Sequence, residues 1–158
     1  MLKANSLREY LTTHLPGVAA SPENLVIRVP KGRTCASGRP GDAFEYRYTL
    51  LVVLLDYAGD IDVVTMAIMT WARRHQPELI FNPDRSLRDI DFEADILDND
   101  RVDIAFTLPL TEVVLAGTDE QGKPVFTHQD EPDYRALYGS DDGTWTPETE
   151  GHLTAGAE

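Results

Sequence analysis

The chain has 158 residues and carries 27 acidic against 14 basic residues, which gives a formal net charge of −13. A chain of this length suits one domain that buries about 70% of its unfolded surface, so it needs no metal or disulfide to fold. Its single cysteine, Cys35, excludes an internal disulfide framework and is typical of a reducing compartment. The acidic balance disfavours nonspecific binding to nucleic acid.

The apolar segments do not predict a membrane protein. The first residues, MLKANSLREYL, mix polar and apolar side chains and lack the continuous apolar core of a signal peptide. The apolar segments 50–55 and 61–72 are shorter than the roughly 20 residues that span a bilayer. We therefore expect neither secretion by this route nor insertion into a membrane.

The N-terminal third predicts a helix, a strand and a loop. Leu7, Leu11 and Leu15 have helical spacing, Ser6 and Glu9 match a capping box, and Pro16-Gly17 ends the helix. The segment 25–29 is rich in β-branched residues and predicts a strand that ends at Pro30. The glycine-rich segment 31–43 predicts a loop.

The middle of the chain predicts a long strand and a helix. The strand 44–57 alternates at first and then becomes apolar on both sides. The helix begins at Asp60 or Asp62 and runs to residue 76, before Pro77. Because this helix is apolar almost all round, we expect it to have more than one packing partner. Its candidate interface residues are Met66, Met69 and Trp71.

The segment 89–96 alternates without error between apolar and acidic residues. The apolar side holds Ile90, Phe92, Ala94 and Ile96, and the other side holds Asp89, Asp91, Glu93 and Asp95. A turn at 97–101 and a second alternating strand at 102–110 complete a hairpin. The elements predict an α+β fold in which two main helices pack on a mostly antiparallel sheet.

The composition changes after Thr118. Residues 119–158 hold ten acids against two bases, a net charge of −8, together with many glycines and prolines. We therefore expect a domain at 1–118 and an acidic, partly flexible C-terminal extension at 119–158. Within it, Gln121-Gly122 is compatible with the turn of a short hairpin.

Three acidic residues near a turn, Asp98, Asp100 and Asp103, have some likeness to a calcium loop. They lack the glycine at position six and the bidentate glutamate of an EF-hand, and the alternative is an ordinary Asx-rich turn. A metal-dependent hydrolase that uses these three residues is one hypothesis that calorimetry with divalent cations would test. The acidic row of the segment 89–96 has side chains about 7 Å apart, which favours a solvated strand face over a chelating pair.

The remaining titratable residues predict no active site. The four histidines, His14, His75, His128 and His152, show no metal-ligand spacing. No base is recognisably placed to activate Cys35, and the segment 32–41 lacks the Gly-Lys-Ser/Thr of a P-loop. We predict no catalytic residue, no metal and no cofactor.

A basic stretch interrupts the otherwise acidic chain. Arg28, Lys31, Arg33 and Arg39 occur without one acid between them, and Arg47 follows on the next strand. The stretch is either a contact surface or a solvated loop that balances the acidic surface of its own chain. An acidic strand and a basic loop on one chain permit head-to-tail contact between copies, which closes into a ring if the rotation allows.

The longer motifs carry a resemblance to a known family. The segments FEYRYTLLVVLLDYAGDID at 44–62 and DIDFEADILDNDRVDIAFTLPLTE at 89–112 are the most specific, and MLKANSLREYL and the end of the helix, RHQPEL, add to them. Over about residues 1–115 the chain resembles the tail completion protein R family of contractile-tailed temperate bacteriophages and their prophages.

The resemblance implies a tail-terminator-like structural protein of the virion tail, assembled in the host bacterial cytoplasm. Such a protein caps the head-proximal end of the tail tube and joins the head, as part of a homo-oligomeric ring for which a hexamer is one candidate size. Its partners are then tube and sheath proteins and head-completion or connector proteins, with DNA contact only in the ring lumen. The alternative is an acidic binding module of the immunity or inhibitor type, which covers a basic partner.

Overall fold

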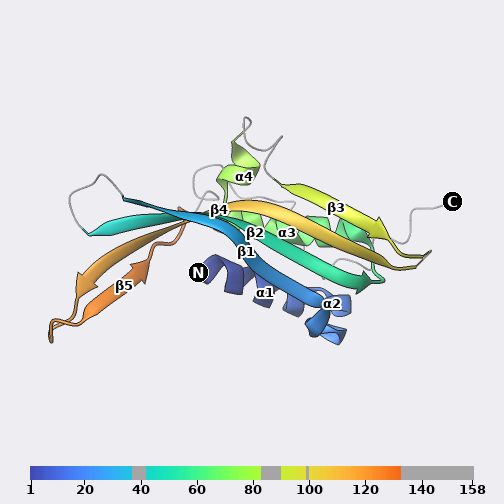
Figure 1. Cartoon of the computed structure of the whole chain (residues 1–158), viewed down its shortest axis with the longest axis horizontal. Coiled ribbons are helices and arrows are strands. Elements are labelled where there is room, and N and C mark those ends of the chain that lie inside the picture. Colours follow the sequence, from blue (N-terminus) through green and yellow to red (C-terminus); the bar gives the residue numbers. More distant parts are fainter. Residues whose placement is uncertain (37–41, 83–89, 99, 133–158) are drawn as a thin grey trace.

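The computed structural model describes residues 1–36, 42–82, 90–98 and 100–132. It is an α+β fold in which helices lie against one face of a twisted antiparallel sheet (Figure 1). The helical elements are α1 (Leu2–His14), α2 (Pro16–Ala20), a 3₁₀ turn η1 (Pro22–Asn24), α3 (Ile61–His75) and α4 (Glu78–Phe81). The strands are β1 (Leu25–Ala36), β2 (Ala43–Tyr57), β3 (Asp91–Ile96), β4 (Val102–Thr118) and β5 (Pro124–His128). The predicted fold class is confirmed.

The sheet has the strand order β1-β2-β4-β3, and β5 pairs with β4 as well. β3 pairs with Val102–Thr107 of β4, whereas β5 pairs with Val114–Thr118 on the same edge. The two short strands therefore lie towards opposite ends of the sheet (Figure 1). Between these two strands the edge of β4 is paired with a side chain. Gln76 Oε1 accepts a hydrogen bond from the Thr111 amide at 3.0 Å.

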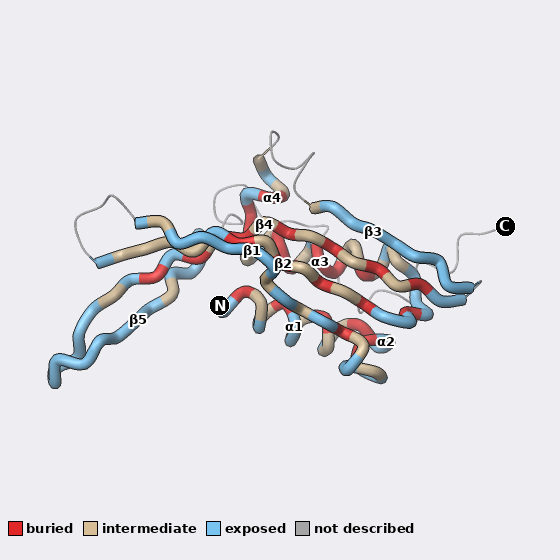
Figure 2. The backbone as a smooth tube through the Cα atoms, viewed as in Figure 1, coloured by how far each residue is buried: buried red, intermediate tan, exposed pale blue. Residues whose placement is uncertain are grey.

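The core lies between the helices and one face of the sheet. Side chains alternate across a strand, and every second residue of β4 from Val102 to Val114 is buried, which fixes the side that faces the helices (Figure 2). Leu50, Val52 and Leu54 of β2 face the same way. No described helix covers the opposite side, which we call the open face.

Helix α3 forms as its sequence predicts. Asp60 is the N-cap residue, and its Oδ1 accepts a hydrogen bond from the Asp62 amide at 2.8 Å. One stripe of the helix is buried, and it comprises Val64, Ala67, Ile68, Trp71 and Ala72. Helix α1 of the same chain packs against α3, so part of the second packing partner that its apolar composition predicts is internal.

Helix α1 begins earlier than the sequence predicts. It starts at Leu2, so Ser6 lies inside it and the predicted capping box is wrong. Glu112 on β4 caps the helix instead, because its two carboxylate oxygens accept hydrogen bonds from the amides of Leu2 and Lys3 at 3.0 and 3.1 Å. The cap comes from a residue more than 100 positions away, and no local pattern indicates it.

Strand β1 does not end at Pro30. It continues to Ala36, with an irregularity of register between Arg28 and Lys31 that absorbs one extra residue. An edge strand tolerates a proline at a bulge because no neighbour needs the missing amide hydrogen. The predicted loop 31–43 is therefore wrong for residues 31–36, and residues 37–41 lie outside the described part.

The hairpin around Gln121-Gly122 is confirmed, since a turn there joins β4 to β5 and Gly122 has a φ of 77°. β5, the C-terminal end of β1 and the adjoining ends of β2 and β4 extend beyond the helices as an arm (Figure 1). β5 thus adds residues 124–128 of the proposed extension to the sheet. Among the described residues, no helix is both long and apolar enough to cross a membrane.

Candidate interaction surfaces

A buried polar cluster joins α1, α3, β2 and β4. It consists of Lys3, Tyr48, Gln76 and Glu112. Lys3 Nζ donates to Gln76 Oε1 at 2.9 Å and to Glu131 Oε1 at 2.6 Å. The Tyr48 hydroxyl donates to Glu112, and His128 Nδ1 lies 2.9 Å from Glu112 Oε2. Each charged member has partners within the fold, so the cluster joins elements and presents no free reactive group.

The cluster perturbs two titrating groups. Burial acts to raise the pKa of Glu112, but the hydrogen bonds from the Tyr48 hydroxyl and the Leu2 and Lys3 amides outweigh it and hold this pKa below its usual value. Burial and the hydrogen bond to Glu112 raise the pKa of Tyr48. At neutral pH the pair is a carboxylate and a neutral phenol, which suits a structural contact.

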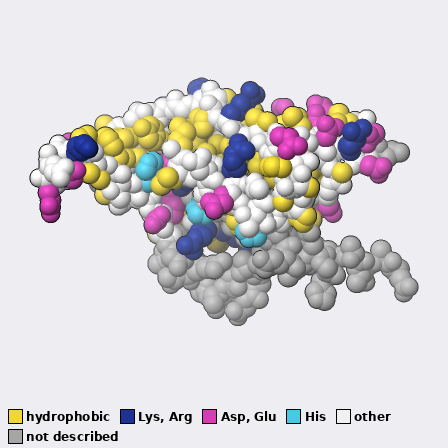
Figure 3. Space-filling model, turned by 90° about the horizontal axis from the view of Figure 1, so that it is seen from below, with side chains coloured by type: hydrophobic (Ala, Val, Ile, Leu, Met, Phe, Trp, Pro, Cys, Tyr) yellow, Lys and Arg dark blue, Asp and Glu magenta, His cyan; other side chains and the backbone are white. Residues whose placement is uncertain are grey.

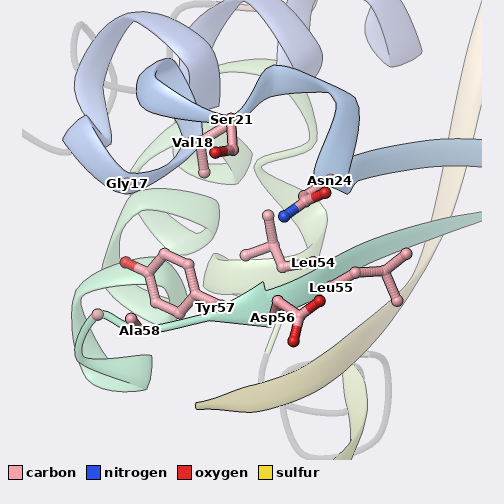
Figure 4. Close-up of a pocket in the computed structure, with 10 residues that line it drawn as sticks. Gly17, Val18, Ser21, Asn24, Leu54, Leu55, Asp56, Tyr57 and Ala58 are labelled. Atoms are coloured by element: carbon pink, nitrogen blue, oxygen red, sulfur yellow. The ribbon is translucent and has the colours of Figure 1, made fainter. Parts of the chain in front are cut away.

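A pocket of about 340 Å³ lies between α2 and the end of β2 (Figure 4). Val18, Leu54 and the Tyr57 ring supply apolar groups, while Ser21 and Asn24 supply polar ones. Asp56 is its carboxylate, and Asp56 Oδ1 accepts a hydrogen bond from Arg101 at 3.2 Å. The Asp56 carboxylate is thus already engaged in an ion pair with Arg101.

The acidic turn between β3 and β4 uses its carboxylates internally. Asp98 accepts hydrogen bonds from the Asp100 amide at 3.0 Å and from the Arg101 guanidinium at 3.0 and 2.7 Å. Asp103 Oδ1 accepts one from the Asp56 amide at 2.8 Å. The described residues contain no group of three or more His, Cys, Asp or Glu side chains that would hold a metal ion.

The histidines and Cys35 form no common site in the described part of the chain. His14 Nδ1 lies 2.8 Å from the carbonyl oxygen of Tyr10, and the His75 ring stacks on Trp71. Burial and the nearby Arg74 and Lys3 charges lower the pKa of His75. Cys35 is half-exposed on β1, and His152 lies outside the described residues.

The basic stretch lies on a strand instead of a loop. Arg28, Lys31 and Arg33 pair in register with Leu51, Thr49 and Arg47 of β2. Residues opposite one another share a face, so the three bases stand in one row on the open face. All three are exposed, as is Arg47, whose guanidinium donates to Glu45 Oε2 at 3.0 and 2.8 Å. Arg39 lies outside the described residues.

The acidic row lies on the open face at the other edge of the sheet. Asp91, Glu93 and Asp95 pair in register with Thr107, Ala105 and Asp103 of β4, and all three acids are exposed. Asp89 lies outside the described residues. The two predicted rows therefore share one face but are separated by β2 and β4.

The apolar side of β3 differs from its prediction. The alternation is confirmed, since Phe92 and Ile96 pair with Phe106 and Val102 on the helix side. Both are nevertheless uncovered, with 64% of Phe92 and 83% of Ile96 exposed. Periodicity indicates which side chains share a side but not whether another element reaches over them. Sequence reasoning therefore missed this exposed apolar surface.

The three helix candidates differ in exposure. Trp71 is 1% exposed, and its Nε1 donates to Ser6 Oγ at 3.1 Å, so its side chain belongs to the core and its prediction as an interface residue is wrong. Met66 is half-buried, and Met69 is 38% exposed. Only the methionines remain accessible to a partner.

A second exposed apolar surface lies on the open face of the arm, and its members are Val113, Leu115 and Val125. Phe126 is exposed too, but it pairs with Ala116 and lies on the helix side. Figure 3 shows hydrophobic side chains along this end of the molecule, at the left of the view. Phe126 also contacts Phe44 edge-on, with ring centroids 6.5 Å apart. The sequence prediction missed this surface because it assigned these residues partly to an extension.

Comparisons with known proteins agree with the resemblance found in the sequence. Residues 1–132 match the family model of P2 phage tail completion protein R (GpR). The tail completion protein R of Escherichia phage P2 is 34% identical over 115 residues, which cover 73% of this chain and 74% of that protein. No solved structure matches the chain significantly.

Proposed function

Because the chain belongs to the P2 phage tail completion protein R (GpR) family, we propose that it is a ring-forming subunit that caps the head-proximal end of the tail tube. The family is one of phage tail assembly, so a place in the virion tail and interaction with other tail components come with membership. The finer role is that the ring ends tail growth and offers a surface to the head.

One observation carries the proposal of a ring. The open face ends in a basic edge strand, β1, and an acidic edge strand, β3. Opposite charges on two different surfaces favour contact between unlike surfaces of two copies, and such contacts form a ring when the rotation closes.

The role is structural and not catalytic, and it begins in the host bacterial cytoplasm before the virion is complete. In the described part of the chain the turn carboxylates and the buried cluster are engaged by internal hydrogen bonds. We expect the ring to bind tail-tube or sheath proteins on one side and head-completion or connector proteins on the other.

Deleting the gene from the phage or prophage that encodes it tests the role in the tail. Electron microscopy of the lysate should show unjoined heads and tails of abnormal length, and the wild-type chain supplied in trans should restore virions. Joined particles with normal tails in the uncomplemented lysate would contradict the proposal.

Sedimentation of the purified protein, alone and with the tail-tube protein, tests the ring. We expect an oligomer of defined size. If only monomer is found under both conditions, the proposed ring is wrong. A stable one-to-one complex with a basic protein would favour the acidic binding module.

A further inference from the structure

We infer that copies of this protein join by continuing the sheet, with β1 of one copy pairing antiparallel to β3 of the next. This inference rests on the proposed ring and names the two edges that build it. Within the sheet, β1 and β3 are the outer strands of the order β1-β2-β4-β3, and successive strands are antiparallel. β1 and β3 consequently run in opposite directions. Copies in the same orientation therefore meet with an antiparallel pair.

Charge selects this pairing over its alternatives. β1 contains three bases and no acid, whereas β3 contains three acids and no base. Both rows stand on the open face, so they would lie side by side across a β1–β3 junction. Pairing β1 with another β1 would oppose bases to bases, and β3 with β3 would oppose acids to acids, which is unfavourable in a sheet. Among the described residues, neither row has an ion-pair partner in its own chain.

The bulge brings the two rows into the same spacing. Arg28 and Lys31 are three positions apart, but the irregularity between them places both on the open face opposite Leu51 and Thr49. The three bases thus occupy successive rungs, as the three acids of β3 do. One register satisfies all of them, and its pairs are Arg28 with Asp95, Lys31 with Glu93, and Arg33 with Asp91.

The helix side of the junction is complementary in the same register. Phe92 would lie opposite Gly32, which has no side chain. Even a Cβ at Gly32 would come within 3.2 Å of Tyr48 Cβ, so the Phe92 ring is the group that can cover this position. An aromatic residue over an edge glycine covers backbone that is otherwise bare. Ile96 would lie opposite Ile27, which packs partly against the core. The pairing would therefore cover the two exposed apolar residues of β3.

The register implies a stagger between copies that suits closure. Arg28 is in line with Asp91 across the sheet, through Leu51 and Thr107, so pairing it with Asp95 shifts the next copy by four residues. Four residues correspond to about 13 Å along the strand direction, and the four strands of one copy span about 19 Å perpendicular to it. The ratio of these two lengths sets the tilt of the strands. The strands then tilt by roughly 35° to the ring axis, which is the tilt usual in closed sheets.

Charge reversal tests the pairing on the full-length chain. One variant carries Arg28→Glu, Lys31→Glu and Arg33→Glu, and the other carries Asp91→Lys, Glu93→Lys and Asp95→Lys. Each alone should raise the dissociation constant between copies at least about 100-fold, because three attractions become repulsions. An equimolar mixture should associate again, since each junction then pairs unlike charges. Circular dichroism and the unfolding midpoint verify that each variant is folded.

A further variant controls for net charge. Glu9→Lys, Glu120→Lys and Asp130→Lys reverse three exposed acids outside β1 and β3, match the net-charge change of the Asp91, Glu93 and Asp95 variant, and should leave association unchanged. If the mixture of the two edge variants fails to associate, or if the control weakens association equally, the pairing is wrong.

Cysteine cross-linking tests the register with the charges largely intact. In a Cys35→Ser background, Lys31→Cys with Glu93→Cys should give disulfide-linked copies under mild oxidation. Thr49→Cys with Glu93→Cys is the control, because Thr49 is on the same face but on the inner strand β2. Equal cross-linking of both pairs, or none with position 31, would overturn the register. If every variant still forms an oligomer of the wild-type size, the edge pairing is refuted, but the proposed ring is not.

Discussion

Glu112 holds together parts of the chain that are far apart in sequence. Its carboxylate accepts hydrogen bonds from the Leu2 and Lys3 amides of α1 and from the Tyr48 hydroxyl of β2, and it is only 4% exposed. Replacing it by glutamine puts an amide donor among these donors. We expect Glu112→Gln to lower the free energy of unfolding by about 2 kcal/mol. Urea unfolding followed by circular dichroism measures this loss.

The control for this change is Glu120→Gln, which removes a carboxylate from an exposed turn. It should alter the free energy of unfolding by less than about 0.5 kcal/mol. Equal stability of both variants would show that the Glu112 carboxylate does not cap α1.

The stabilisation that Glu112 provides should be lost at acidic pH, because its pKa is lower in the folded than in the unfolded chain. The folded-state pKa of Glu112 is lowered by its hydrogen bonds. Its stabilisation is therefore complete above the unfolded-state value of about 4.3 and is lost as the pH falls from there through the folded-state pKa. The difference in unfolding free energy between the wild type and Glu112→Gln should shrink on acidification below about pH 4.3. A difference that stays constant down to pH 2 would contradict this linkage.

Helix α3 is an element whose core role can be separated from any contact role. Trp71 is 1% exposed, whereas Met69 on the same helix is 38% exposed. Trp71→Ala should lower the free energy of unfolding by about 3–5 kcal/mol because it leaves a large cavity. Met69→Ala should cost less than about 1 kcal/mol, and thermal unfolding of the two variants gives the comparison. Similar losses would mean that the helix packs differently from the structure.

Elements with a strict hydrophobic period could be predicted from the sequence. The alternation of 44–57 and 102–110 matches β2 and the first half of β4, and Asp60 marks the start of α3. Glu112 was predictable in part, because it continues the buried positions of the strand from Val102 to Leu110. A carboxylate at such a position indicates a buried partner for it.

Features that depend on distant contacts could not be predicted. The start of α1 depends on Glu112, and the continuation of β1 past Pro30 depends on its being an edge strand. The exposure of Phe92 depends on how far the helices reach over the sheet. The two charged rows were found in the sequence, but only the strand order places them at opposite edges of one face.

The two sides of the sheet differ in whether helices cover them. Helices cover one side of the sheet, and the described residues leave the open face without a covering element. If copies join edge to edge, the sheets form the wall of the ring, because their strands tilt by only roughly 35° to the ring axis. Every helix layer then lies on the same side of that wall and every open face on the other, so the outer surface and the lumen of the ring differ chemically. The ends of the ring, which strand ends and loops form, are left for tail and head components.

The extent of the folded unit is a property of the whole chain that truncation measures. β5 pairs with β4, and Glu131 Oε1 lies 2.6 Å from Lys3 Nζ, so residues 119–132 contact both the sheet and the start of α1. A chain that ends at Thr118 should therefore unfold with a free energy about 2–3 kcal/mol lower than a chain that ends at Pro132. Glu131→Gln in the longer chain isolates the contribution of the ion pair. Equal urea midpoints for the two truncated chains would instead place the end of the folded unit at Thr118, as composition alone predicts.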